Sequence, residues 1–285
     1  MKRVVALYRS PAYSPSRHLQ NDRAILDEVI GQLLARGGWT VDRATEQDVA
    51  AGYLPDGDVY LNMCQGPHAS SRLQELLPPG VPCINTPGAV LACHRHRMAP
   101  RLLDRGVAFP PTVFLSTTGS PEPVSAGWLA ADSRDPVWVK RGDVHAQTAE
   151  DVVAVSVAEI PTALSRFAGR GIGRVALQAH VPGPVVKFYG VMDREYFHWY
   201  PVDGPGVAGA EAYTEALHDL AERAARALGL AVYGGDAVLA LPDSPTLIDL
   251  NDWPSFAPVR SPAAAAIADH AHRRALTDRY SCSNQ

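Results

Sequence analysis

Two aspartates and an asparagine near the carboxyl end of the chain offer hard oxygen ligands. Asp249 and Asn251 stand two positions apart in the apolar segment 247–251, so on a strand their side chains project from the same face. Antiparallel pairing with the strand beginning at Asp236 brings a third oxygen ligand to the same end. Two carboxylates and a carboxamide form an incomplete shell that suits Mg²⁺, whose other positions are filled by water and substrate phosphate.

The alternative for this segment is turn chemistry, because Asp and Asn are common in loops. Both residues, however, are flanked by Ile248 and Leu250 in an apolar strand. A carboxylate in such a place normally costs stability. The pattern therefore favours a metal site over a turn.

The lysines are few and two of them lie in apolar runs. The chain has 26 basic residues, of which only Lys2, Lys140 and Lys187 are lysines. Lys140 ends the run 137–140, and Lys187 lies within the run 185–189. Lysine is a compact phosphate-binding charge, whereas arginine is a planar fork, so both positions suit phosphate contacts. The alternative is that both are solvated strand residues.

The first 85 residues alternate strand and helix patterns. Short apolar strands are predicted at residues 4–8, 39–41, 59–63 and 83–85, and apolar residues at helical spacing over 25–34 predict a helix that ends at Gly37 and Gly38. This alternation predicts a parallel, doubly wound sheet. The first strand is not followed by Gly-x-Gly-x-x-Gly, so the sequence gives no support for a dinucleotide site of that kind.

The rest of the chain predicts a mixture of helices and strands. A helical pattern covers residues 86–105, extended backbone follows over 106–112, and a Ser/Thr/Pro/Gly-rich loop covers 116–126. Helices are expected at 213–228 and 262–276, and a turn at 242–245. Strands are expected at 137–140, 175–181, 185–191, 196–200, 231–241 and 246–251, with a hairpin turn through 192–195.

Composition limits the classes of partner. The formal charge is −4 over 285 residues, so the whole chain carries no nucleic-acid footprint. No run of eighteen apolar residues occurs, and the apolar start is too short for a signal peptide, so we expect a soluble, cytoplasmic protein that does not bind a membrane. Four cysteines without Cys-x-x-Cys spacing predict reduced thiols. Cys93, His94 and His96 diverge on a helix, which argues against zinc there.

The order of these segments resembles the ATP-grasp superfamily. The resemblance runs from Cys83 to Phe256 and is carried by Val137-Trp138-Val139-Lys140, Leu177 to Gly183, the strand with Lys187, Gly229 to Asp236, and Ile248 to Asn251. It implies an α/β chain with a parallel pre-ATP-grasp sheet, followed by two α+β subdomains that clasp a nucleotide. The implied boundaries are a first domain over 1–85, a linking helix and strand over 86–115, a small subdomain over 116–182 and a large one over 183–285.

The resemblance also implies roles for site residues. Lys140 would contact the ATP phosphates, Lys187 would face the transferred phosphate, and Asp236, Asp249 and Asn251 would hold one or two Mg²⁺ ions. The backbone of the hinge would read adenine; its residues are Gln178, Ala179, His180 and Val181. We expect the triphosphate between two sheets, with Lys187 on one wall and the three oxygen ligands on the other.

Two positions depart from the family pattern. The family usually has a lysine in the helix before Gly106, where this chain offers Arg95, with Arg97 as an alternative. The loop after Lys140 is poor in glycine and so offers fewer backbone N–H groups to phosphate. The Lys-x-Gly-x-x-His pattern of this loop is nearer to that of synapsin-like members of the family. There His145 would replace some of the backbone N–H groups that bind phosphate.

The resemblance predicts an ATP-dependent carboxylate–amine ligase that works through an acyl phosphate. Its substrates would be a small-molecule or peptide carboxylate and an amine, with Arg194 as a weaker candidate for the acyl-phosphate oxygens and Arg9 for an anionic substrate. Many relatives form dimers, so a homodimer is a further possibility. The alternatives are a small-molecule kinase like the inositol-phosphate kinases of the superfamily, and a non-catalytic nucleotide-binding module.

Overall fold

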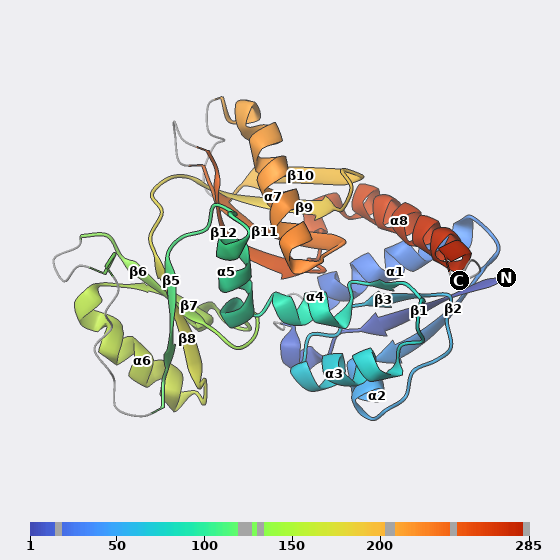
Figure 1. Cartoon of the computed structure of the whole chain (residues 1–285), viewed down its shortest axis with the longest axis horizontal. Helices are drawn as coiled ribbons and strands as arrows, with labels where there is room; N and C mark the ends of the chain where they lie inside the picture. Colours follow the sequence, from blue (N-terminus) through green and yellow to red (C-terminus); the bar gives the residue numbers. More distant parts are fainter. Residues whose placement is uncertain (15–18, 119–126, 130–133, 203–208, 240–243, 282–285) are drawn as a thin grey trace.

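The computed structural model describes residues 1–14, 19–118, 127–129, 134–202, 209–239 and 244–281. Over these ranges the strands form three four-stranded sheets, which lie in three separate parts of the molecule (Figure 1). None of the described helices is long and apolar enough to span a membrane. Short 3-10 helices occur at Pro11–Tyr13, Ala149–Asp151, Val157–Glu159, Ala210–Tyr213 and Ala257–Val259.

The first sheet is parallel, which confirms the prediction for the N-terminal segment. Its strands are β1 (Lys2–Tyr8), β2 (Trp39–Thr45), β3 (Val59–Asn62) and β4 (Cys83–Ile84), in the order β2-β1-β3-β4. Alternate residues of β1 pack on opposite faces, against α1 (Leu19–Ala35) on one and α2 (Glu46–Ala50) and α3 (Pro67–Leu76) on the other. The sequence analysis predicted α1 but neither α2 nor α3.

The second sheet is antiparallel and has one helix on one face. It consists of β5 (Thr112–Ser116), β6 (Val137–Arg141), β7 (Val152–Val155) and β8 (Arg174–Ala179), in the order β5-β8-β6-β7. Helix α6 (Ile160–Gly169) packs with Val137 and Val139 of β6 in one apolar core. Neither β7 nor α6 was predicted from the sequence. Most of the predicted loop at 116–126 lies outside the described residues.

The third sheet carries the predicted hairpins. Its strands are β9 (Val185–Val191), β10 (Tyr196–Pro201), β11 (Val232–Val238) and β12 (Thr246–Asp252), all antiparallel in the order β10-β9-β11-β12. Helices α4 (Pro87–Ala92), α5 (Arg95–Asp104) and α7 (Thr214–Leu228) pack on one face. The expected single helical stretch over 86–105 is thus two helices, separated at Cys93 and His94. Part of the expected turn at 242–245 lies outside the described residues.

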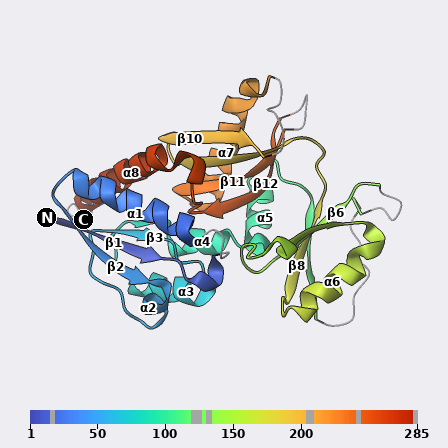
Figure 2. The ribbon, with the colours of Figure 1, turned by 180° about the vertical axis from the view of Figure 1, so that it is seen from behind.

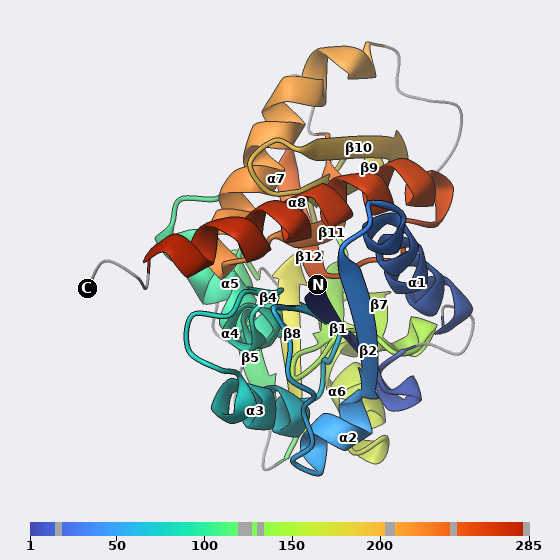
Figure 3. The same cartoon turned by 90° about the vertical axis from the view of Figure 1, so that its right-hand side faces the viewer.

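The last helix joins the first and third sheets. Helix α8 (Arg260–Ser281) lies beside α1 (Figures 2 and 3), and its alanines share one apolar core with Val4 of β1 and with Val191 and Val232 of the third sheet. Although this helix lies within the large subdomain expected over 183–285, it covers the first sheet as well. The expected boundary at residue 85 is therefore crossed by a continuous core.

Asn85 ties the first sheet to β11 with its side chain. The amide Nδ2 donates to Val232 O at 2.7 Å, and Oδ1 accepts from the backbone N–H groups of Ala231 and Val232 at 2.7 and 2.9 Å. Asn85 is buried, so water cannot take over its hydrogen bonds to the backbone of Ala231 and Val232 if the side chain is removed. The side chain therefore acts as a polar bridge between two sheets.

Replacing Asn85 by alanine is expected to lower the free energy of unfolding by about 3 kcal/mol, because buried backbone groups lose their partners at roughly 1–3 kcal/mol each. Urea unfolding followed by circular dichroism measures the change. Gln74→Ala removes an exposed amide and serves as the control, with an expected change within about 0.5 kcal/mol. An Asn85→Ala protein as stable as this control would contradict the bridge.

Candidate active site

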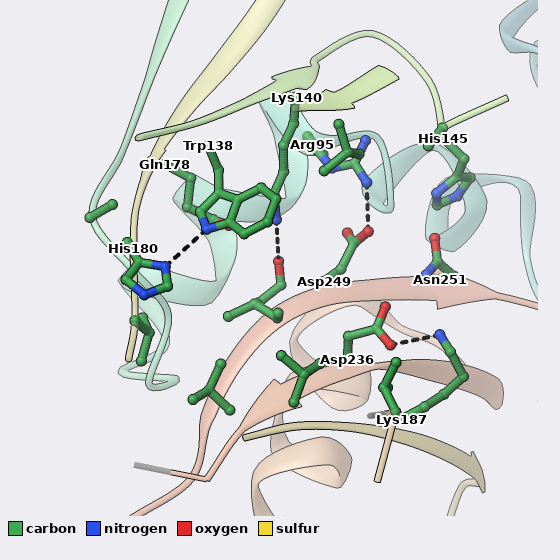
Figure 4. Close-up of a pocket in the computed structure, with 18 of the residues that line it drawn as sticks. Arg95, Trp138, Lys140, His145, Gln178, His180, Lys187, Asp236, Asp249 and Asn251 are labelled. Carbon is green, nitrogen blue, oxygen red and sulfur yellow. Dashed lines mark hydrogen bonds and ion pairs between the residues drawn. The ribbon is translucent and has the colours of Figure 1, made fainter. Parts of the chain in front are cut away.

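A cavity of about 620 Å³ lies between the second and third sheets. Figure 4 shows its two walls, with Trp138 and Lys140 of β6 on one and Lys187, Asp236 and Asp249 of the third sheet on the other. Arg95 of α5 and His145 of the loop after β6 border the same space. The sequence-predicted residues that line this cavity are Arg95, Lys140, His145, Gln178, Ala179, His180, Val181, Lys187, Asp236, Asp249 and Asn251.

The register of the third sheet brings the acidic groups together. Asp236 of β11 lies opposite Lys187 of β9 on one side and opposite Asp249 of β12 on the other. Because directly paired residues share a face, these side chains all project into the cavity. On β9 the alternate residues Val186 and Phe188 are buried in the core on the opposite face, which fixes the direction of Lys187.

Lys187 stands on the same wall as the oxygen ligands, and the expectation that it faces them from the other wall was wrong. Its Nζ lies 2.6 Å from Oδ1 of Asp236. Burial by itself lowers the pKa of Lys187, but the adjacent Asp236 carboxylate outweighs it and the pKa is raised. The ammonium group is therefore charged at neutral pH.

The cation on the opposite wall is Lys140, which lies on β6. It is buried, and its Nζ donates to the backbone oxygen of Ile248 at 3.1 Å across the cavity. Burial lowers the pKa of Lys140 to about 8, although Asp249 acts in the opposite direction. The two predicted phosphate-binding lysines thus enter one cavity from two different sheets.

Arg95 forms a buried ion pair with Asp249. Its Nη2 lies 2.5 Å from Asp249 Oδ2, and its Nη1 donates to Arg141 O at 3.1 Å. Burial would raise the pKa of Asp249, but Arg95 and then Lys140 outweigh it and hold the pKa below its usual range. The other oxygen, Oδ1, is buried without a protein partner. The alternative residue Arg97 is exposed and does not line the cavity.

Two side chains of the loop after β6 form hydrogen bonds that fix its position. His145 Nε2 lies 3.0 Å from Asp252 Oδ1, which also accepts from Gln65 Nε2 at 3.2 Å. Gln147 Nε2 donates to the backbone oxygen of Ala12 at 2.9 Å. The loop therefore spans from the second sheet to loops of the first sheet and covers one end of the cavity.

Two arginines considered from the sequence lie away from the cavity. Arg194 is in the β9–β10 turn, where it pairs with Glu215 and Asp219 at 2.6 and 2.7 Å on an exposed surface. The turn points away from the cavity, so Arg194 is no longer a candidate for the acyl-phosphate oxygens. Arg9 bonds Met63 O, Asp22 and Trp253 O, which directs its donors to the protein itself.

Comparison with solved structures finds proteins of similar fold that align along at least 95% of this chain. A D-alanine–D-alanine ligase from Bacillus anthracis is 14% identical, with 99% of each chain covered and a TM-score of 0.68. The D-alanyl-alanine synthetase A from Vibrio cholerae is also 14% identical, with 100% of this chain and 99% of that chain covered and the same TM-score of 0.68. A RimK domain ATP-grasp protein from Sphaerobacter thermophilus is 18% identical, with 95% and 99% covered and a TM-score of 0.63.

This chain has the ATP-grasp fold. The predicted fold class is thereby confirmed, with a parallel sheet followed by two antiparallel sheets. No model of a known protein family matches the sequence, and no curated protein matches it either. The likeness is therefore one of three-dimensional structure, and the cavity lies between the two antiparallel sheets of that fold.

The acidic wall of the ATP-grasp cavity has the donor set for a magnesium ion. Asp236, Asp249 and Asn251 contribute two carboxylates and an amide from paired strands, and Oδ1 of Asp249 has no protein partner. Hard oxygen ligands that leave positions for water and phosphate are those that Mg²⁺ prefers. The residues present therefore fit the ion that the fold implies.

Sequence reasoning missed Trp138 and Asp252, both of which adjoin this site. Trp138 Nε1 donates to His180 Nδ1 at 3.2 Å on the second-sheet wall. Asp252 holds His145 and follows Asn251 in the chain, a position whose burial the sequence does not indicate. The alternation of Val137 and Val139 with Trp138 and Lys140 was the available signal for the first, because it places the indole beside the lysine.

Cys93 also approaches this group. Its side chain offers a ligand atom within 4.8 Å of those of His145 and Asp252. Burial raises the pKa of the Cys93 thiol well above its ordinary value, so the thiol stays protonated. With His145 and Asp252 bonded to each other, the three residues form a packed cluster next to the loop.

Proposed function

We propose that this protein is an ATP-dependent carboxylate–amine ligase that forms an amide or peptide bond and releases ADP and phosphate. The observation that carries the proposal is one cavity that joins Lys140 and Arg95 to the row of Lys187, Asp236 and Asp249. The shared fold with two ligases that join alanines supports the reaction class. The substrates would be a small-molecule or peptide carboxylate and an amine.

Each group at the cavity has a role in this proposal. Lys140 and Arg95 neutralise the phosphates of ATP, and the loop with His145 covers them. The hinge residues bind the base through their backbone and are Gln178, Ala179, His180 and Val181. Asp236, Asp249 and Asn251 hold Mg²⁺, which when bound draws negative charge from the phosphate oxygens.

The proposed reaction has two steps. A carboxylate oxygen attacks the terminal phosphorus of ATP, the bond to ADP breaks, and an acyl phosphate forms. The amine then attacks the carbonyl carbon, loses a proton, and phosphate leaves as the amide forms. The carboxylate is activated because phosphate is a far better leaving group than an oxide. Lys187 stabilises the negative charge on the phosphoryl group during its transfer, because its ammonium group is held in a fixed position beside that charge.

A product balance tests this proposal directly. Purified protein is incubated with ATP, Mg²⁺ and pools of carboxylates and amines, and ADP and free phosphate are measured in parallel. A ligase releases the two in equal amounts together with an amide. ADP without free phosphate, alongside a phosphorylated metabolite, would make the protein a kinase. A rise in melting temperature with ATP and no turnover would make it a nucleotide-binding module.

Replacing Lys187 by methionine is expected to slow ADP release roughly 100-fold or more, because a positioned cation no longer meets the developing charge. Arg194→Met is the matched control, since it removes a cation from the neighbouring turn outside the cavity. Its rate should stay within about twofold of the wild type, as expected for an exposed ion pair. Equal losses in the two variants would contradict the role of Lys187.

A further inference from the structure

Three chemically different side chains come together beside the loop after β6. Cys93 lies between α4 and α5, His145 lies in the loop, and Asp252 is the last residue of β12. The Cys93 sulfur, a ring nitrogen of His145 and a carboxylate oxygen of Asp252 all lie within 4.8 Å of one another. Cys93, His94 and His96 belong to one short segment, whereas this group joins three segments that are far apart in the sequence.

The three side chains are held close to the spacing of metal ligands. Cys93 and Asp252 are buried, and the Cys93 sulfur bonds Ala89 O of α4 at 3.4 Å. Nε2 of His145 lies 3.0 Å from Oδ1 of Asp252. Two ligand atoms on a tetrahedral zinc ion, each at about 2.0–2.1 Å from the metal, lie about 3.4 Å apart. A small movement of the loop therefore admits an ion between His145 and Asp252.

Two buried carboxylates share one arginine beside this group. Arg9 Nη1 lies 3.1 Å from Oδ2 of Asp22, and Arg9 Nη2 lies 3.9 Å from Oδ2 of Asp252. That second oxygen has no hydrogen-bond partner among the residues that the structure describes. Because burial makes an unbalanced charge costly, the arrangement favours a further cation. A divalent cation bound together with the Cys93 thiolate balances these charges when His145 is neutral.

We propose that Cys93, His145 and Asp252 bind a zinc ion at a site separate from the oxygen ligands of Mg²⁺. Thiolate, imidazole and carboxylate are all ligands of Zn²⁺, whereas Mg²⁺ takes oxygen ligands. The thiol gives up its proton to solvent when the ion binds. Three protein ligands leave the fourth tetrahedral position for water. His94, whose ring lies 6.2 Å from that of His145, has a buried Nε2 without a hydrogen-bond partner in the described part of the chain.

A zinc ion at this position would fix the loop after β6. His145 borders the cavity (Figure 4), while Cys93 directly precedes α5 and Asp252 belongs to β12. The ion therefore links a loop of the second sheet to the third sheet and its helices at one end of the cavity. This inference goes beyond the proposed function and does not depend on it, because the ion fixes the loop whatever reaction the cavity performs.

Cobalt(II) serves as a visible probe of the zinc site. The full chain, freed of metal with a chelator, is titrated with Co²⁺ in excess Mg²⁺, and then with Zn²⁺. A thiolate ligand gives Co²⁺ a charge-transfer band in the near ultraviolet, which the wild type should show and which Zn²⁺ should abolish. Cys93→Ser can still donate to Ala89 O, but it should lose the band and bind Zn²⁺ at least about 10-fold more weakly.

Two further substitutions separate this site from its surroundings. Cys83→Ser is the matched control, because it changes a thiol that bonds Asn85 O and is not part of the group, and it should keep the band. Asp249→Asn changes a proposed Mg²⁺ ligand and should keep the band as well. His145→Gln changes a loop residue and should weaken Zn²⁺ binding at least about 10-fold, which tests the site if Cys93→Ser does not fold.

The outcomes distinguish this site from the ligase proposal. A wild type without the band, a band that survives in Cys93→Ser, or unchanged Zn²⁺ affinity in folded His145→Gln overturns the zinc site and leaves the ligase proposal as it is. Loss of the band in Asp249→Asn would place the ion among the Mg²⁺ ligands and would also overturn a separate site. A failed product balance would overturn the ligase without touching the zinc site.

Discussion

Replacing Asp249 by asparagine is expected to slow ATP-dependent product formation roughly 100- to 1000-fold, the range seen when one preorganised charge-stabilising group is removed. Asp249 is the carboxylate at the centre of the proposed site. It pairs across the strands with Asp236, bonds Arg95 and keeps one buried oxygen without a protein partner. Asparagine has the same shape but no negative charge, so it binds Mg²⁺ less well and no longer balances the two cations beside it.

The rate of ADP release and the Mg²⁺ concentration that gives half-maximal AMP-PNP binding measure this change. We expect the half-maximal concentration to rise at least about 10-fold, in line with the loss of an inner ligand. Asp219→Asn makes the same chemical change on an exposed carboxylate and should leave both quantities within about twofold of the wild type. If the Asp249→Asn enzyme needs the same Mg²⁺ concentration as the wild type, Asp249 does not bind the metal ion.

Replacing Arg95 by methionine is expected to lower the free energy of unfolding by roughly 3–5 kcal/mol, the cost of leaving one partner of a buried ion pair alone. Arg95 and Asp249 are both largely shielded from water, and burial alone would raise the pKa of the carboxyl group. Without the guanidinium, the carboxylate loses the partner that offsets its desolvation. Urea unfolding in the absence of nucleotide isolates this effect from ligand binding.

The double variant Arg95→Met/Asp249→Asn tests whether the broken ion pair causes the loss of stability. Because the second substitution removes the unpaired charge, the double variant should be less destabilised than the sum of the two single variants, by about 1–3 kcal/mol. Strict additivity of the two losses would mean that Arg95 and Asp249 stabilise the protein independently.

The parts of the site that sequence reasoning predicted are those set by strand alternation. Asp249 and Asn251 share a face because they stand two apart on a strand, and Lys187 faces away from the core because Val186 and Phe188 face into it. The order in which these segments follow one another carried the resemblance to ATP-grasp proteins. Local pattern and order together were enough for the fold class and for most of the cavity lining.

The parts that were missed depend on tertiary placement. Arg194 was named as a weaker candidate for the acyl-phosphate oxygens, but it lies in the hairpin turn after β9, where it pairs with exposed carboxylates outside the cavity. The wall on which Lys187 stands follows from the pairing of β9 with β11, which links strands 41 or more residues apart. Helices α2 and α3 are short and carry few apolar residues, so their periodicity is weak.

Helix α8 has a consequence for the order in which the polypeptide becomes native. Val4 and Ala6 of the first strand share their core with residues 263–275 as well as with α1, and residues 263–275 are synthesised after both antiparallel sheets. This face of β1 therefore stays partly uncovered until residues 263–275 have been synthesised. We expect nascent chains that stop before residue 260 to expose this apolar face and to depend on chaperones, whereas the antiparallel sheet of β5 to β8 has its own helix and can fold earlier.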